Sequence, residues 1–416
     1  MSTYKILGQS KVCGSLKVDT AKNSLLPILA GSILCDEQVT INKVTYYEDI
    51  NKMVQILKFL GVSIKQTNKT IVINPSSITK NEVPSYLAGT LRASIFLLGP
   101  LLSKFKKATV YLPGGCNIGS RPIDLHLSSL KSLGAKVYEG NGFVCVDGSN
   151  MKSGNVHLSF SSVGATENII MASVFLSGTT KISGVAKEPE IVDLCNFLNK
   201  MGAKIYGAGT DNIQITGVRR LNKVTYTPIA DRIIAGTYAL IPLICGGELE
   251  VCGCNTNHIL PLISLIKNNT CKYNITNDKI YLRVDNRPNG FGLIQTMPYP
   301  QFPTDLQQPL CSAATICNGN TTIIENIFEN RFKHTSQLLK MGANIKVNGR
   351  VCTIQGVKKL HGAELLAEDL RGGASLVLAS LGAEGYSTVS NAEIISRGYY
   401  NLDKKLQSIG IKIQKQ

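Results

Sequence analysis

The chain of 416 residues lacks an apolar run long enough to cross a bilayer. A transmembrane helix needs about 18 or more consecutive apolar residues. The best candidate, residues 233–245, is shorter and contains Gly236, Thr237 and Pro242. Residues 1–11 also lack the apolar core of a secretory signal peptide. We therefore expect a cytoplasmic protein with no membrane partner.

Acidic residues are scarce: 28 Asp and Glu stand against 44 Lys and Arg, which gives a net charge of +16. Such a field attracts anionic partners. The basic residues are spread along the chain, and neither a basic run nor a nucleic-acid-binding signature is present. A cleft that binds phosphates and carboxylates is therefore favoured, and a nucleic-acid-binding protein is the weaker alternative.

Closely spaced cysteines are also rare, although the chain has 12 of them. Only Cys252 and Cys254 are adjacent in this sense, and His258 is the sole further ligand nearby. A structural metal site needs more Cys or His at ligand spacing. Scattered cysteines without a secretion signal indicate free thiols in a reducing compartment, so we expect no metal.

The sequence repeats a short turn that closes a helical pattern. Leu-Gly or Met-Gly recurs, or Ile-Gly in the last copy, at intervals of 73, 68, 140 and 68 residues, at the glycines 61, 134, 202, 342 and 410. The interval of 140 residues leaves room for one degenerate copy near residues 266–270. Six units of about 70 residues then account for the whole length.

Each unit combines helical and strand patterns in the same order. Residues 168–176 form a small-residue-rich apolar helix, residues 178–185 alternate as a strand does, and residues 189–200 have amphipathic helical spacing. A further strand follows at residues 204–206. The alternation predicts an α+β fold with helices packed under sheets, and it disfavours a doubly wound parallel sheet.

The six units group as two domains of three. We expect one domain over residues 20–229 and a second that combines residues 1–19 with residues 230–416. The strand Tyr4–Leu7 would then pair with the C-terminal half. Ligands often bind where two domains meet, so the active site is expected in the cleft between them.

A glycine-rich segment, residues 112–126, places Cys116 directly after two glycines and puts Arg121, Asp124 and His126 behind it. Glycines let a backbone approach a ligand closely. A cysteine near cations on such a loop is placed for a chemical role. The structural alternative is an ordinary turn that carries a buried thiol.

Charged residues recur at turns and expected helix starts, where helix N-termini add affinity for anions. Arginine binds carboxylate and phosphate in bidentate fashion, although any single arginine can equally form a surface salt bridge. Asp305 follows two prolines and Thr304, which is expected to cap the helix that begins at Asp305. The Asp305 carboxylate is either an N-cap or a general base for a substrate hydroxyl, and the residues alone leave both open.

Long ordered motifs resemble the UDP-N-acetylglucosamine enolpyruvyl transferase family over residues 11–400. The resemblance implies a two-domain inside-out α/β barrel built from six βαβαββ repeats, with helices inside and sheets outside. It also implies transfer of the enolpyruvyl group of phosphoenolpyruvate to the 3′-hydroxyl of the nucleotide sugar, with release of phosphate and no cofactor. The motifs lie at residues 113–126, 162–168, 187–194, 302–307, 325–332 and 369–374.

The resemblance also implies roles for single residues. Cys116 matches the family's general acid and fosfomycin target, and Asp305 matches the base for the hydroxyl. Residues that match phosphoenolpyruvate ligands are Lys22, Arg92, Cys116, Arg121, Arg331, Arg371 and Arg397, of which Lys22 and Arg397 also count as catalytic. Residues that match nucleotide-sugar contacts are Asn23, Arg92, Arg121, Pro122, Asp124, Leu125, Ser162, Val163, Gly164, Asp305 and Ile327.

Four positions depart from the family pattern. Phe160 replaces an expected basic residue, Ile234 an expected acidic residue and Phe96 a common tryptophan, and Pro309 is expected in the first turn of its helix. None of these removes a catalytic position. Two alternatives remain: the sister enzyme that uses shikimate 3-phosphate, which the Cys116 loop argues against, and a catalytically silent protein that binds nucleotide sugar.

Overall fold

The computed structural model describes residues 2–112 and 122–416. These residues divide into two compact units. Unit A is the described part of residues 20–229, and unit B combines the chain up to Asp19 with residues 230–416. Within the described ranges, no helix has the length and apolar character that a bilayer crossing requires.

The described strands form six four-stranded sheets with one common pattern. In each sheet the first strand is parallel to the second, and the third and fourth strands are antiparallel to their neighbours. The sheets of unit A are β14 (Val224–Tyr226), β3 (Val39–Asn42), β5 (Thr70–Asn74), β4 (Ser63–Gln66); β6 (Glu82–Val83), β7 (Lys107–Tyr111), β9 (Phe143–Asp147), β8 (Lys136–Gly140); and β10 (Asn155–His157), β11 (Thr179–Ser183), β13 (Asn212–Thr216), β12 (Lys204–Tyr206). Those of unit B are β2 (Val12–Lys17), β15 (Gly247–Cys252), β17 (Lys279–Val284), β16 (Lys272–Ile275); β18 (Gly292–Thr296), β19 (Asn320–Glu325), β21 (Val351–Gln355), β20 (Asn344–Asn348); and β22 (Glu364–Leu366), β23 (Tyr386–Ser390), β1 (Thr3–Leu7), β24 (Lys412–Lys415).

Strand β1 closes the last sheet of unit B. It pairs antiparallel with β23, with Lys5 opposite Thr388, and antiparallel with β24, with Ile6 opposite Ile413. The expected pairing of Tyr4–Leu7 with the C-terminal half is confirmed. The N-terminal strand therefore supplies the third strand of a sheet whose other strands lie near the C-terminus.

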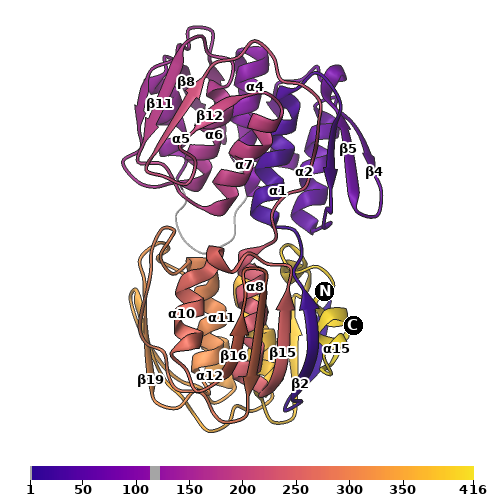
Figure 1. Ribbon diagram of the computed structural model, residues 1–416, viewed down its shortest axis with the longest axis vertical. Helices are drawn as coiled ribbons and strands as arrows, with labels where there is room; N and C mark the ends of the chain where they lie inside the picture. The colour runs from indigo at the N-terminus through magenta and orange to yellow at the C-terminus, as the bar shows by residue number, and fades with distance from the viewer. Residues whose placement is uncertain (1, 113–121) are drawn as a thin grey trace. The chain divides into compact units, whose positions relative to one another are not determined.

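One face of each sheet is buried and the other meets solvent. In β13, for example, Ile213 and Ile215 are buried while Asn212 and Gln214 are exposed. This alternation of period two is what a strand with one covered face requires. The covered faces lie over helices, as Figure 1 shows within each unit.

Six helices of the described residues form the centres of the two units and are buried almost all round. In the longest, all residues from Leu370 to Leu381 are buried. Small residues such as Gly372, Gly373 and Ala374 let these helices approach closely. The central helices are α1 (Lys22–Gly31), η3 (Arg92–Leu97) continuing into α4 (Leu98–Phe105), and α6 (Val163–Ser173) in unit A, and α8 (Arg232–Ala239), α11 (Thr304–Ala314) and α13 (Leu370–Gly382) in unit B.

A second set of six described helices carries the repeated glycine turn. After five of them the predicted glycine has a φ between 85° and 105°, a conformation that glycine adopts without strain. The degenerate copy ends instead at Asn268, the residue after α10. These helices are α2 (Glu48–Phe59), α5 (Asp124–Ser132), α7 (Pro189–Lys200), α10 (Leu260–Lys267), α12 (Thr335–Lys340) and α15 (Leu402–Ser408), and the remaining α-helices are the short α3 (Ser85–Ala88), α9 (Ile241–Cys245) and α14 (Glu393–Ser396).

The α+β fold with helices inside and sheets outside is confirmed, but two local predictions are wrong. Thr304 does not cap α11: it is the first helical residue, after an N-cap at Pro303. Pro309 is the sixth residue of that helix and so lies beyond its first turn. A proline there removes one backbone hydrogen bond, which the surrounding buried helix tolerates.

The eleven described cysteines are all free thiols, as expected. Burial raises the pKa of several of them, to about 12 for Cys195 and Cys317. Within residues 2–112 and 122–416, no three His, Cys, Asp or Glu side chains converge as a metal site.

Candidate active site

Most of the candidate residues lie at the N-terminal ends of the central helices. Lys22 and Arg92 begin α1 and η3, and Ser162 is the N-cap of α6. In unit B, Asp305 and Arg371 are the second residues of α11 and α13. Helix N-termini offer unpaired backbone N–H groups and a partial positive charge, so each unit presents an environment suited to anions.

Asp305 lies between two buried arginines. Its Oδ1 atom is 2.6 Å from Nη2 of Arg331, and its Oδ2 atom is 3.2 Å from Nη2 of Arg371. The two arginine side chains are 2% and 4% exposed, whereas that of Asp305 is 30% exposed. The carboxylate therefore forms the accessible end of a buried cationic pair. Because Pro303 is the N-cap, the N-cap alternative for Asp305 is wrong.

The start of α13 is held by Asp369. This residue is the N-cap, and its Oδ1 atom accepts hydrogen bonds from the backbone N–H groups of Arg371 (3.0 Å) and Gly372 (2.8 Å). Burial acts to lower the pKa of Arg371, but the Tyr399 phenol and the carboxylates of Asp305 and Asp231 outweigh it, and the pKa is raised. Asp231 is the N-cap of α8, so charged groups from the starts of all three central helices of unit B interact.

His334 is a buried neighbour of this cluster. Its Nδ1 atom is 3.5 Å from Nε2 of Gln308, which also donates to Oδ2 of Asp369 at 3.1 Å. Burial lowers the pKa of His334 to about 4, although Asp369 and the backbone of Arg331 act in the opposite direction. The imidazole is therefore neutral near pH 7.

Acidification is expected to destabilise unit B through His334. The unfolded chain takes up a proton near pH 6.5, whereas the folded imidazole resists it down to about pH 4. This contribution to stability is complete above pH 6.5 and falls by about 3 kcal/mol as the pH drops to about 4. Urea unfolding at pH 7 and pH 4.5 should show a smaller loss for His334→Gln than for the unmodified chain. The exposed His361→Gln is the control, and an equal loss in all three proteins would contradict the assignment.

In unit A, the candidate Lys22 is bound to a residue of the neighbouring helix. Its Nζ atom donates to Oδ2 of Asp49 at 2.9 Å, and the two side chains are 11% and 3% exposed. A buried lysine needs such a partner to remain charged. Asp49, which lies on α2, therefore orients the lysine at the start of α1.

His126 and Asn168 join two candidate nucleotide-sugar segments, residues 122–125 and 162–164. Oδ1 of Asn168 accepts from the Gly99 N–H (2.8 Å), and its Nδ2 group donates to the Ile95 carbonyl (2.9 Å). These partners fix the amide, so the Nδ2 group also donates to Nδ1 of His126, at 2.7 Å. His126 Nδ1 is thus an acceptor, and the imidazole is neutral with its proton on Nε2. Its ring lies against Gly164 at the start of α6.

Gly164→Ala is expected to strain this contact. The added Cβ would lie 2.9 Å from Cε1 and 3.1 Å from Nε2 of His126, and 3.2 Å from the ring of Phe96. Since Asn168 holds the imidazole, overpacking should cost about 1–3 kcal/mol and raise KM for the nucleotide sugar more than for phosphoenolpyruvate. Gly154→Ala is the control, because its Cβ would meet only Leu133 at 3.8 Å. Equal urea midpoints and KM values for the two variants would argue against this packing.

The remaining candidates are less fully defined. Cys116 and Arg121 lie outside the described residues. Arg92, Leu125, Ile327 and Arg397 are half-buried, whereas Asn23, Pro122 and Asp124 are exposed. Among the departures, Phe160 is 52% exposed just before Ser162, Ile234 is fully buried in α8, and Phe96 lies beside the start of α6.

Three further residues belong to the site that the sequence reasoning missed: Asp49, Thr304 as a side-chain ligand, and Glu325. Glu325 is completely buried at the end of β19 and bonds to Thr304. A carboxylate inside the apolar pattern Thr-Thr-Ile-Ile-Glu was the available signal, because buried charges need partners.

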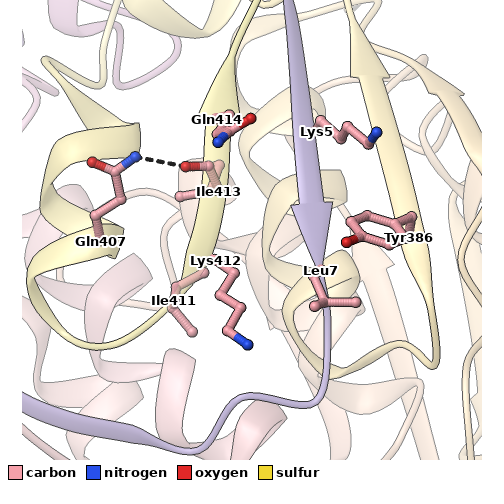
Figure 2. A pocket seen from close by; sticks show the side chains of 8 residues that line it. All are labelled: Lys5, Leu7, Tyr386, Gln407, Ile411, Lys412, Ile413 and Gln414. Atoms are coloured by element: carbon pink, nitrogen blue, oxygen red, sulfur yellow. Dashed lines mark hydrogen bonds between the residues drawn. The ribbon is translucent and has the colours of Figure 1, made fainter.

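A surface pocket in unit B is separate from these candidate residues. It is lined by Lys5, Leu7, Tyr386, Gln407 and residues 411–414. Figure 2 shows the side chain of Gln407 donating to the Ile413 carbonyl, at 2.6 Å, beside the strand that carries Lys412. No candidate site residue lines this pocket among the residues that the structure describes.

Comparison with known proteins supports one family across the whole chain. Residues 6–406 match the family model of EPSP synthase (3-phosphoshikimate 1-carboxyvinyltransferase). The chain is 46% identical to UDP-N-acetylglucosamine 1-carboxyvinyltransferase 2 of Caldanaerobacter subterraneus, over 99% of each chain. It is 42% identical to UDP-N-acetylglucosamine 1-carboxyvinyltransferase 1 of Carboxydothermus hydrogenoformans, over 100% of this chain and 98% of the relative. The crystal structure of the enolpyruvyl transferase NikO from Streptomyces tendae has the same fold, with a TM-score of 0.90 at 21% identity, over 100% of this chain and 98% of that one.

Proposed function

Because the chain belongs to the EPSP synthase family of enolpyruvyl transferases, we propose that it transfers the enolpyruvyl group of phosphoenolpyruvate to UDP-N-acetylglucosamine. The acceptor is the 3′-hydroxyl of the sugar, phosphate leaves, and the product enters peptidoglycan synthesis. The observation that carries this assignment is the identity of 46% over 99% of the chain to a relative named for that reaction.

The charges of the described site suit both substrates. Phosphoenolpyruvate carries a carboxylate and a phosphate, and the nucleotide sugar carries a diphosphate. Lys22 in unit A and Arg331 and Arg371 in unit B are buried cations at or beside helix N-termini. Donors fixed in advance toward developing negative charge are typically worth about 3–4 kcal/mol of transition-state stabilisation each.

Asp305 is the base in this proposal. Without substrate, Arg331 and Arg371 both donate to its carboxylate, which makes it a weak acceptor for a further proton. An anionic group of phosphoenolpyruvate competes for the same N–H groups. The Asp305 oxygen that it releases then accepts the proton of the sugar hydroxyl, so the base becomes effective when both substrates are bound.

Cys116 is the general acid that protonates the methylene carbon of phosphoenolpyruvate, and its thiolate is the group that fosfomycin alkylates. Arg92, Arg121 and Arg397 complete the phosphoenolpyruvate ligands. The nucleotide sugar contacts residues 122–125 and 162–164 in addition to Asn23 and Ile327. The reaction needs no metal or organic cofactor, and a cytoplasmic location stays a prediction.

Phosphate release from phosphoenolpyruvate tests the proposal, with UDP-N-acetylglucosamine or shikimate 3-phosphate as the acceptor. Release with the nucleotide sugar alone is the expected result. Release with shikimate 3-phosphate alone would replace the acceptor and keep the transfer chemistry. If neither acceptor gives phosphate, the chain is a silent nucleotide-sugar-binding protein, which calorimetry with UDP-N-acetylglucosamine would detect.

A further inference from the structure

A buried carboxylate lies behind the candidate site of unit B. Glu325, the last residue of β19, is completely buried. Its Oε1 atom accepts hydrogen bonds from the backbone N–H groups of Ile327 (2.9 Å) and Phe328 (3.1 Å). Its Oε2 atom accepts the hydroxyl hydrogen of Thr304 at 2.8 Å. Three donors thus converge on one carboxylate, which acts only as an acceptor.

The Thr304 hydroxyl passes this constraint on to Arg331. A hydroxyl group has one hydrogen, and that of Thr304 is committed to Glu325. Its oxygen is therefore free to accept from Nη1 of Arg331, at 3.1 Å. A guanidinium group can only donate, so the order of donors runs without ambiguity from Arg331 through Thr304 to Glu325. The other terminal nitrogen of Arg331, Nη2, contacts Asp305.

Glu325 also fixes the face of the same guanidinium. By accepting from the N–H of Phe328, it holds the turn that carries the Phe328 ring, whose centroid is 5.1 Å from Cζ of Arg331. A ring at this distance favours a cation above it. Nε of Arg331 is buried and has no hydrogen-bond partner among the described residues. Thr304, Asp305 and Phe328 are therefore the contacts that orient the group.

We propose that Glu325 and Thr304 are positioning residues for the transfer site. The carboxylate directs the Thr304 hydroxyl and the Phe328 ring, these two fix the Arg331 guanidinium, and the guanidinium sets the orientation of Asp305. The inference rests on the proposed function, because it takes Asp305 and Arg331 as the groups that meet substrate. Small displacements of such groups reduce rates strongly, because the reacting atoms must be aligned.

Thr304→Val tests the relay with little change of shape. It removes the hydroxyl and leaves both backbone hydrogen bonds of Glu325 intact. Since Nη1 of Arg331 and Oε2 of Glu325 each lose a partner, kcat should fall by about 10- to 100-fold, with less than about threefold change in the Kd of UDP-N-acetylglucosamine. Thr304→Ser restores the hydroxyl and should return kcat to within about threefold of the unmodified chain.

Thr335→Val is the matched control. Thr335 is also a buried threonine at the first position of a helix in unit B, but its hydroxyl donates to the backbone carbonyl of Phe332 at 2.7 Å. It should leave kcat unchanged. A kcat for Thr304→Val within twofold of the unmodified chain, or a Thr304→Ser variant as slow as Thr304→Val, would overturn the relay.

Glu325→Gln provides a second, independent variant. Its amide oxygen can still accept the backbone N–H groups, but its NH2 group faces the Thr304 hydroxyl and reverses the required direction. The relay predicts that the double variant with Thr304→Val is about as slow as either single variant. Effects on kcat that multiply would show that the two residues act separately, and thermal unfolding confirms that each variant is folded.

The side-chain NMR signals of Arg331 test the same inference without turnover. Rotation about its Cζ–Nε bond should be slow in the unmodified chain and in Thr304→Ser, and faster in Thr304→Val and Glu325→Gln. Equal rotation rates in all four proteins would contradict the inference whether or not the chain has activity. If the rates differ as expected but no phosphate is released with either acceptor, the proposed function fails and the positioning of Arg331 stands.

Discussion

Asp305→Ala is expected to lower turnover by about 10²- to 10⁴-fold while it changes the affinity for UDP-N-acetylglucosamine by less than tenfold. The carboxylate is the accessible end of the cluster with Arg331 and Arg371, and a group in that position meets the hydroxyl only as the reaction begins. Phosphate release at saturating substrate and calorimetric titration of the nucleotide sugar measure the two quantities separately.

Asp305→Ala also leaves two buried guanidinium groups without the carboxylate between them, so the variant should be less stable, and its fold must be checked by circular dichroism. Asp403→Ala is the matched control, because Asp403 is likewise the second residue of a helix in unit B. It removes a carboxylate from a helix N-terminus and should leave turnover unchanged. Equal losses of binding and turnover in Asp305→Ala would reduce Asp305 to a binding residue.

Cys116→Ala is expected to lower turnover by about 10²- to 10⁴-fold, because the methylene carbon loses its proton donor. Cys116→Asp should retain activity, since a carboxylic acid can also donate a proton, and it should resist fosfomycin because no thiolate is present to be alkylated. An ordinary carboxyl group has a pKa near 4, against about 8.5 for a thiol. The pH optimum of Cys116→Asp should therefore lie below that of the unmodified chain.

Turnover with and without prior incubation with fosfomycin, measured between pH 5 and pH 9, checks these expectations. Cys13→Ala is the control, because Cys13 is an exposed thiol on β2 and its loss should change neither activity nor inactivation. Unmodified turnover in Cys116→Ala would refute the acid role. Inactivation of Cys116→Asp at the original rate would place the reactive thiol elsewhere.

The repeat architecture could be predicted from the sequence because it depends on local patterns. The turn glycines at 61, 134, 202, 342 and 410 all have positive φ, which few other residues adopt without strain. The spacing of apolar residues predicted α7 over Pro189–Lys200 with its observed bounds. Burial of one helix face or one strand face follows directly from a period of 3.6 or two residues.

Local signals failed where a side chain had two possible partners. Thr304 follows a proline at a helix start, which predicts a cap, yet its hydroxyl donates to Glu325, which lies 21 residues later in sequence. Pro309 was expected in the first turn because the boundary of α11 depends on how Pro303 is accommodated. Hydrogen bonds between distant residues decided both positions.

By itself, the sequence determined the number of repeats, the placement of helices under sheets, the family, and the candidate residues from Lys22 to Arg397. Only the tertiary structure decided which charges meet: Asp305 with Arg331 and Arg371, Lys22 with Asp49, and His126 with Asn168. The reason is physical. Periodicity and turn chemistry act over a few residues, whereas the energy of a buried charge depends on partners that the fold brings from 26 to 66 residues away.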